Sequence, residues 1–492
     1  MKRSSLLLSL SLVACAGPKS PSAAVAHLES SPTKTAQRQL PPALDVDPAT
    51  LTPPPLDFTI REPEITTLPN GVTVYLLEDH STPLVTLRAL VPAGSAEDPS
   101  AKLGLAALVA SMLREGGAGA LEPAALDERL EFAAADLSAG ASEEFSTVSL
   151  SVRARELAAM LPIFADVVQR PRFDEKRLAI TRARFVEGVR RREDRPDAVA
   201  DRALAKAVFG PTSILGREPT VATLEAITAA DLRSFFAANW GPGGARLVIT
   251  GDVRRDEVLA ALATHFGAWR GGTPKSRAWD PPPPLATRVI LVPRKVAQAK
   301  VRIGTWGFRR ATPKEFPLRL VNTALGSFGV GRLYRQIRDE RGLAYSAWSS
   351  IGAGPTTGLF TAGFDTRPEQ VGAALELATK ILSGVAATEP PSAAELTTAK
   401  DMALNAFAFR FDSAAKIALE RATLDLVGYP KDYLATWRAH LAAVDAPTAA
   451  AAAKQLGQGL QIVVLGPPEK IGDLSAFGPV TVISDVEQFT GP

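Results

Sequence analysis

The chain has 492 residues, of which 46% are hydrophobic and 22% are charged, as is usual for a globular protein. This length exceeds what one ordinary hydrophobic core organises, so we expect two or more domains. The formal net charge of +3 is small, which argues against nucleic acid as a partner. Because the chain has one cysteine, an intrachain disulfide is excluded.

Residues 1–15 have the pattern of a signal peptide. Lys2 and Arg3 precede an apolar run that is too short to span a bilayer and that ends at Cys15. The tetrapeptide Leu-Val-Ala-Cys resembles the lipobox of bacterial lipoproteins, in which the cysteine is lipidated; the alternative is a plain secretory signal with a chance cysteine. The resemblance implies a lipid anchor at Cys15 in the bacterial cell envelope, in the outer membrane and facing the periplasm.

Residues 16–56 are rich in Pro, Ser, Thr and Ala and show no periodicity, which predicts a disordered tether between this anchor and the folded part. No later segment is apolar for the roughly 18 residues of a spanning helix. We therefore expect the lipid anchor to be the membrane attachment.

The first half, residues 57–270, mixes strand and helix patterns. Residues 66–77 predict two strands joined by an Asn70-Gly71 turn. Other strand patterns occupy residues 84–91, 137–152 and 245–253, and helical patterns occupy residues 103–113, 126–134, 156–168, 174–192, 224–240 and a segment ending at Phe209. This mixture predicts the α+β class.

A Pro-rich linker, residues 271–287, precedes a second half, residues 288–485, with a similar order of elements. Its strand patterns cover residues 288–304 and 347–364, and its helical patterns cover residues 316–326, 368–382, 393–410 and 414–427. LQIVVLGPP, which starts at Leu460, has the form of ARLVITGDV, which starts at Ala245. We therefore predict two homologous halves, each an α/β sandwich of a mixed sheet with helices.

The segment Gly331 to Tyr345, GRLYRQIRDERGLAY, combines four arginines with a helix signal and a following strand. Gly342 is placed to end the helix, so Arg338 lies near the helix end and Tyr345 near the strand start. An apolar stripe is predicted from Phe328, Val330, Leu333 and Ile337.

A guanidinium and a phenol brought together can both donate to a carbonyl oxygen or to a developing oxyanion. The alternative for Arg338 is an arginine that caps the carbonyls of its own helix, and for Tyr345 a half-buried strand tyrosine.

Four stretches in this order resemble the pitrilysin/insulinase-type zinc metallopeptidases, the inverzincins. They are LPNGVTVYLLEDHSTPLVTL, REDRP, ARLVITGDV and GRLYRQIRDERGLAYS. The chain is most similar to the subunits of the mitochondrial processing peptidase and to bacterial heterodimeric members. The resemblance implies that the two halves form a clamshell around a cavity.

Active members of this family bind zinc through H-x-x-E-H on a helix. The equivalent positions here are Ala107, Ala110 and Ser111, and the downstream glutamate ligand is replaced by Gly188, next to Glu187. The four histidines of the chain also lack the spacing of a zinc site. We therefore expect no bound metal and no zinc peptidase activity from the chain alone, with zinc held by a partner subunit.

In these peptidases an arginine and a tyrosine seven residues apart contact the substrate carbonyl, and Arg338 and Tyr345 match that spacing. The resemblance predicts a non-zinc subunit that pairs with a zinc-bearing homologue to hydrolyse a peptide or unfolded polypeptide. The strand that binds peptide in relatives corresponds here to Ala139, Gly140, Ala141 and Ser142. Two alternatives stay open, an inactive scaffold and a peptide-binding lipoprotein that acts alone.

Overall fold

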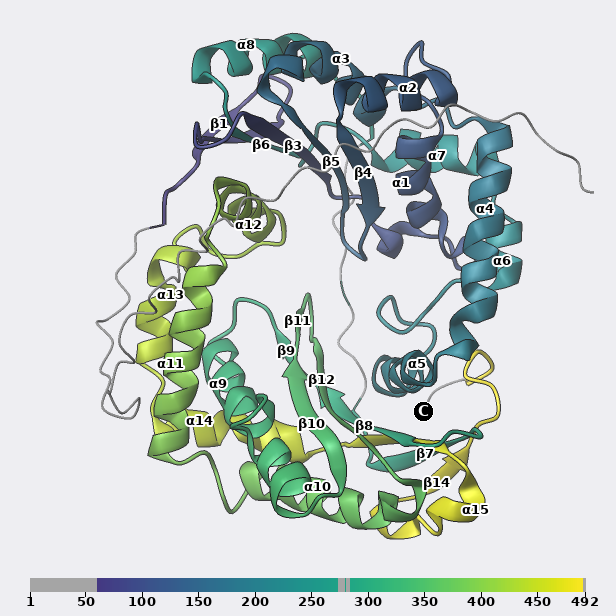
Figure 1. Cartoon of the computed structure of the whole chain (residues 1–492), viewed down its shortest axis with the longest axis vertical. Helices are drawn as coiled ribbons and strands as arrows, with labels where there is room; N and C mark the ends of the chain where they lie inside the picture. Colours follow the sequence, from purple (N-terminus) through teal and green to yellow (C-terminus); the bar gives the residue numbers. More distant parts are fainter. Residues whose placement is uncertain (1–59, 273–278, 280–283, 490–492) are drawn as a thin grey trace, which may run out of the picture. The chain divides into compact units, whose positions relative to one another are not determined.

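The computed structural model describes residues 60–272, 279 and 284–489. These residues form two six-stranded mixed sheets with helices, which confirms the predicted fold class (Figure 1). The predicted signal peptide, Cys15 and the tether lie outside the described residues, as do residues 273–278 and 280–283 of the predicted linker. None of the helices in the described ranges combines the length and apolarity needed to cross a membrane.

The first sheet has the order β1-β2-β6-β3-β5-β4. Its strands are β1 (Glu64–Thr67), β2 (Thr73–Glu78), β3 (Leu84–Val91), β4 (Asp136–Ala141), β5 (Ser146–Arg153) and β6 (Arg246–Gly251). β2 and β6 are parallel and the other neighbours are antiparallel. The Asn70-Gly71 hairpin is confirmed, because β1 pairs with β2 and Gly71 has a φ of +92° in the turn.

Eight α-helices belong to the described part of the first half. They are α1 (Leu105–Glu115), α2 (Pro123–Ala133), α3 (Leu157–Gln169), α4 (Glu175–Arg190), α5 (Pro196–Phe209), α6 (Val221–Glu225), α7 (Ala229–Asn239) and α8 (Arg255–Phe266). The single helix predicted for residues 224–240 is wrong. Thr228 and Asp231 form a capping box that starts α7 afresh, because each side chain bonds the backbone N–H of the other.

The second sheet has the order β10-β12-β8-β13-β7-β14, and β9 pairs with β11 beside it. The bounds are β7 (Arg288–Pro293), β8 (Ala299–Trp306), β9 (Phe308–Arg309), β10 (Ala344–Ile351), β11 (Ala353–Gly354), β12 (Leu359–Thr366), β13 (Gln461–Gly466) and β14 (Val480–Val482). The order β4-β5-β3-β6-β2 of the first sheet matches β10-β12-β8-β13-β7 here, which confirms the repeat. The end strands differ, since β1 is antiparallel to its neighbour and β14 is parallel.

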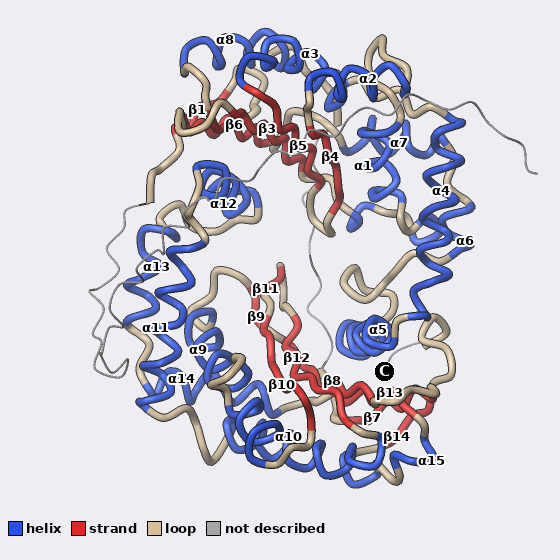
Figure 2. The backbone as a smooth tube through the Cα atoms, viewed as in Figure 1, coloured by secondary structure: helices blue, strands red, loops and turns tan. Residues whose placement is uncertain are grey.

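Seven α-helices and one π-helix belong to the described part of the second half. They are α9 (Glu315–Gly326), the π-helix Tyr334–Glu340, α10 (Val371–Ala386), α11 (Ala393–Phe409), α12 (Ala414–Leu426), α13 (Tyr433–Ala442), α14 (Ala446–Ala453) and α15 (Pro468–Ile471). Figure 2 shows the helices in blue beside the two sheets in red.

The two halves exchange one helix each. α5 of the first half packs on β8 and β13, while α12 of the second half packs on β2 and β6. On β2, Tyr75 and Leu77 join the core that contains α12, while Val74 and Leu76 face the core of the first half. Successive side chains of a strand point to opposite faces, so both faces of β2 are buried in a core. This burial on both faces explains why the sequence of β2 is a continuous apolar run. The described residues accordingly belong to one compact unit.

Candidate functional site

Arg338 lies on the π-helix Tyr334–Glu340 that precedes β10. Gly342, with a φ of +61°, ends this helix as predicted, and its N–H donates to the Arg338 carbonyl at 3.0 Å. The core side of the helix carries Leu333 and Ile337, both buried as predicted. π-Helical turns are rare and occur often at functional sites.

The assignment of Phe328 and Val330 to the apolar stripe is wrong, since they are 80% and 42% exposed. Both residues precede the helix, in the loop that follows α9 at Gly326, so helical spacing does not apply to them. The Phe328 ring instead lies against Tyr334, with 4.8 Å between ring centres.

The guanidinium of Arg338 lies beside two tyrosine rings. Its central carbon is 4.7 Å from the ring centre of Tyr334 and 5.6 Å from that of Tyr345. The guanidinium donates to the Tyr334 hydroxyl and, at 3.2 Å, to Oδ1 of Asp339. The structure therefore brings Arg338 and Tyr345 together, and within the described residues the hydrogen bonds of the guanidinium go to side chains rather than to helix carbonyls.

Tyr345 projects outward from an irregular strand start. Ala344 pairs with Thr366 and Ala347 with Phe364, so β10 contains one more residue than β12 across this interval. Such a β-bulge twists the strand and redirects a side chain. Tyr345 lies in the bulge and is 81% exposed, which differs from a half-buried strand tyrosine. The sequence gives no signal for the bulge, because it depends on the register with β12.

The positions of the zinc motif do not fit a metal. Ala107 and Ser111 are half-buried on α1, Ala110 is buried there, and Gly188 is exposed on α4. Glu187 is on the surface and pairs with Arg191 at 2.5 Å. Residues 60–272, 279 and 284–489 contain no group of three His, Cys, Asp or Glu side chains placed to bind an ion. Alanine and glycine offer no side-chain donor, so this first half cannot rebuild the zinc site.

A buried carboxyl group, Asp98, holds the start of α1. Its two oxygens accept the backbone N–H groups of Gly104 and Ala106, each at 2.8 Å. Burial raises the pKa of Asp98 to about 6, although the N–H donors oppose this shift. Asp98 was not predicted as a functional residue from the sequence, although an aspartate shortly before an apolar helix is a signal for such a contact.

Ala139, Gly140 and Ala141 lie on β4, the end strand of the first sheet, which pairs on one side with β5. Ser142 follows in the turn, where its N–H donates to the Phe145 carbonyl and its own carbonyl accepts from Ser95. The backbone of Ser142 is therefore already bonded. The other three residues form an edge to which another strand can add.

Two family models match this chain. Residues 73–215 match the model described as Insulinase (Peptidase family M16), and residues 226–403 match the model described as Peptidase M16 inactive domain. The chain belongs to peptidase family M16. This assignment confirms the predicted insulinase-type family.

Two M16 relatives carry peptidase names. A Streptomyces coelicolor protein named as an uncharacterized zinc protease is 27% identical over 333 residues, which cover 65% of this chain and 71% of that protein. A probable mitochondrial-processing peptidase subunit beta of Arabidopsis thaliana is 24% identical over 274 residues, which cover 54% of this chain and 51% of that protein.

The solved structure of a peptidase M16 inactive domain from Pseudomonas fluorescens has the same fold. It matches with a TM-score of 0.76 at 24% identity and covers 83% of this chain and 98% of that chain. The M16 fold of this chain thus combines a first half whose zinc-motif positions hold no histidine or glutamate with a second half that presents Arg338 and Tyr345.

Proposed function

We propose that this chain is the non-zinc subunit of a composite M16 metallopeptidase. A homologous partner subunit supplies the zinc ion, and this chain supplies Arg338 and Tyr345. The observation that carries the proposal is the contact between these two side chains at the junction of a π-helix and a β-bulge. The names of the relatives, a zinc protease and a processing-peptidase subunit, support it.

The chemistry of this chain is hydrogen-bond donation to the substrate. An arginine carries a fixed positive charge and several N–H donors, and a tyrosine hydroxyl adds a neutral donor. Together they orient a peptide carbonyl and stabilise the negative charge that develops on its oxygen during hydrolysis. Removal of one such donor typically lowers turnover by about 10²–10³. The partner's zinc, when bound, supplies the activated water.

The proposed substrate is a peptide or an unfolded polypeptide. An extended chain can add to a sheet edge through main-chain hydrogen bonds, and residues 139–141 of β4 provide such an edge in this chain. Their small side chains leave space beside the backbone. The corresponding edge of the zinc-bearing partner would hold the peptide during cleavage, with β4 in a secondary role.

For the location, we propose a lipid anchor at Cys15 that holds the chain in the outer membrane of a bacterial envelope, facing the periplasm. The support is the lipobox pattern that ends at this residue. The test is incorporation of a labelled fatty acid by wild type and by Cys15→Ser. Equal labelling of the two chains would contradict the anchor.

One observation favours an inactive scaffold instead. The guanidinium of Arg338 already donates to Tyr334 and Asp339, so its position has a structural explanation without a substrate. A third possibility, a peptide-binding lipoprotein that acts alone, requires that the purified chain bind peptides without a partner.

The decisive experiment mixes this chain with a zinc-bearing M16 homologue from the same source and measures cleavage of a quenched fluorescent peptide library. Wild type is compared with Arg338→Ala, Tyr345→Phe and the matched control Arg335→Ala, an exposed arginine on the same π-helix. Each chain alone and a chelator complete the design.

The composite peptidase predicts cleavage by the wild-type and Arg335→Ala mixtures, a loss of about 10²-fold or more in the other two, and no cleavage with chelator. Equal rates for wild type and Arg338→Ala would reject the catalytic role and support the scaffold. Peptide binding by the lone chain, without faster cleavage in the mixture, would support the third possibility.

A further inference from the structure

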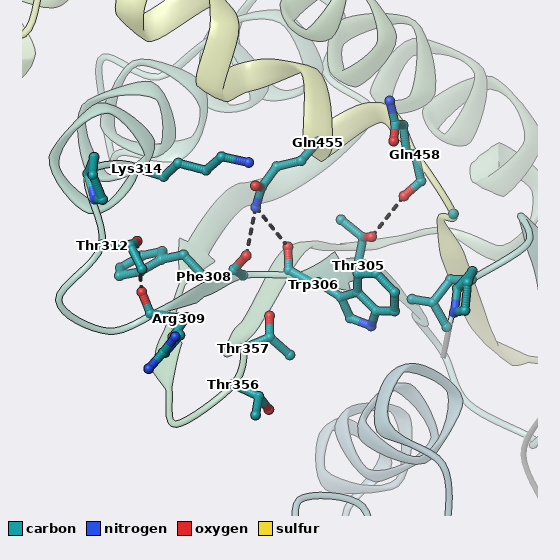
Figure 3. A pocket seen from close by; sticks show the side chains of 15 residues that line it. Thr305, Trp306, Phe308, Arg309, Thr312, Lys314, Thr356, Thr357, Gln455 and Gln458 are labelled. Atoms are coloured by element: carbon teal, nitrogen blue, oxygen red, sulfur yellow. Dashed lines mark hydrogen bonds between the residues drawn. The ribbon is translucent and has the colours of Figure 1, made fainter. Parts of the chain in front are cut away.

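An open pocket of about 710 Å³ lies at the ends of β8 and β9 (Figure 3), and no residue of the Arg338 helix lines it. Strand residues Trp306 and Phe308 line it, and so do Lys314 just before α9 and Gln455 and Gln458 near the start of β13. This volume lies in the range of about 300–1,000 Å³ that is typical of small-ligand sites.

The charges on the pocket wall have one sign. Arg309 and Lys314 line the pocket, and no acidic residue does. Both cations are exposed, and in the described ranges neither side chain has a hydrogen bond or an ion pair. In Figure 3 the Lys314 side chain extends toward Gln455. The Arg309 side chain extends away from Gln455 in the same view, so a ligand with one negative charge would find its cationic partner in Lys314.

The rest of the wall suits a peptide better than a bare hydrocarbon chain. The indole of Trp306 and the rings and aliphatic groups beside it provide apolar surface. Hydroxyl and amide groups interrupt this surface. The side-chain amide of Gln455 donates both N–H groups to the backbone carbonyls of Trp306 and Gly307. Its side-chain carbonyl oxygen therefore remains as an acceptor. A hydrocarbon chain would leave such groups desolvated without partners, whereas peptide amides can bond them.

We propose that this pocket binds the free carboxyl end of a peptide whose last residues are apolar. The carboxylate pairs with Lys314, while Arg309 adds positive charge to the same wall, and the apolar side chains lie against Trp306 and Phe308. The site is separate from Arg338 and Tyr345 and does not depend on a partner subunit. The proposal therefore stands or falls independently of the composite peptidase.

The test measures binding of a fluorescein-labelled hexapeptide that ends in leucine, by fluorescence anisotropy with the full-length chain. The peptide is used with a free carboxylate and as the C-terminal amide. We expect the acid to bind at least about tenfold more tightly than the amide, as the loss of a charged hydrogen-bond partner implies. In the double variant Arg309→Gln/Lys314→Gln this preference should fall to about twofold or less.

The matched control is Arg129→Gln/Lys176→Gln, which removes the same two charges from exposed positions on α2 and α4. It should keep the preference for the acid, and thermal melting should show that both double variants are folded. Equal binding of acid and amide, no saturable binding, or an equal loss in the control would overturn the proposal. Binding of dodecanoate at the pocket without binding of the peptide acid would also overturn it, in favour of a fatty acid.

Discussion

The guanidinium carbon of Arg338 lies 5.6 Å from the ring centre of Tyr345, although the two residues belong to different elements. A π-helix carries the arginine and a β-bulge carries the tyrosine, so two departures from regular geometry meet at this contact. Tyr345 adds little to the core because it is 81% exposed. Packing in the core therefore does not account for its position.

Tyr345→Phe should separate stability from activity. The hydroxyl is removed from an exposed side chain, so the free energy of unfolding should change by less than about 0.5 kcal/mol. Cleavage by the mixture with the zinc-bearing partner should fall by about 10²-fold, because one donor to the oxyanion is lost. Urea denaturation and initial cleavage rates measure the two effects. A large loss of stability would show that the hydroxyl has a structural role.

Much of the fold was predictable from local patterns. β3 was predicted within its observed bounds because Leu84–Val91 alternates, and Gly342 was recognised because a helix end favours glycine at positive φ. The repeat was visible because each half closes with an apolar strand and a glycine, now β6 and β13.

Two features of the fold could not be predicted from local patterns, because they depend on contacts between distant segments. The exchange of α5 and α12 between the sheets joins residues far apart in sequence, and amphipathic spacing does not say which sheet a helix covers. The bulge at Tyr345 depends in the same way on the register between β10 and β12. For the candidate site, the sequence therefore supplied the residues and their spacing, and the structure supplied their contact.

Two glycines should respond in opposite directions to alanine. Gly342 ends the π-helix at a φ of +61°, where an L side chain is strained, so Gly342→Ala should destabilise the fold by about 1 kcal/mol. Gly188 lies inside α4, and a Cβ there meets no atom within 4 Å. Gly188→Ala should therefore stabilise the fold by about 1 kcal/mol. Chemical denaturation of both variants measures the signs, and two changes of the same sign would contradict the assignment.

Arg302 on β8 should be important for the packing of α5 on the second sheet. The residue is 4% exposed. Its guanidinium donates to Asp197 at 3.1 Å and to Asp201 at 2.8 Å, both on α5. It also donates to Asp365 on β12 at 3.2 Å. Arg302→Met keeps much of the volume and removes these hydrogen bonds, while Lys300 still pairs with Asp197 and Asp365. Because the carboxylates on α5 are half exposed, we expect a loss of about 1–2 kcal/mol in the free energy of unfolding.

The control for this loss is Arg129→Met, an exposed arginine on α2, which should change stability by less than about 0.5 kcal/mol. Equal midpoints of urea denaturation for Arg302→Met and wild type would show that the ion pairs contribute no net stability. That result is physically possible because desolvation of buried charges opposes their attraction.

Asp98 should make stability depend on pH in an unusual direction for a carboxyl group. Burial raises its pKa in the folded chain to about 6, above the ordinary value of 3.8. A raised folded pKa means that the folded state holds its proton at a pH where the unfolded state has lost it. The resulting stabilisation is full below pH 3.8 and is lost as the pH rises through about 6.

Asp98→Asn removes the titrating carboxyl group, so the difference in the free energy of unfolding between wild type and this variant isolates the contribution of Asp98 to the pH dependence. A shift of roughly two pKa units corresponds to about 3 kcal/mol. The advantage of wild type over Asp98→Asn in the free energy of unfolding should accordingly shrink by about that amount between pH 4 and pH 7.5. The amide also loses one of the two oxygens that accept from Gly104 and Ala106, so the variant should be less stable than wild type at pH 4.

Urea denaturation of both chains at the two pH values measures the difference. An advantage that grows with pH would mean that the two N–H donors, which favour the ionised carboxylate, outweigh the cost of its burial.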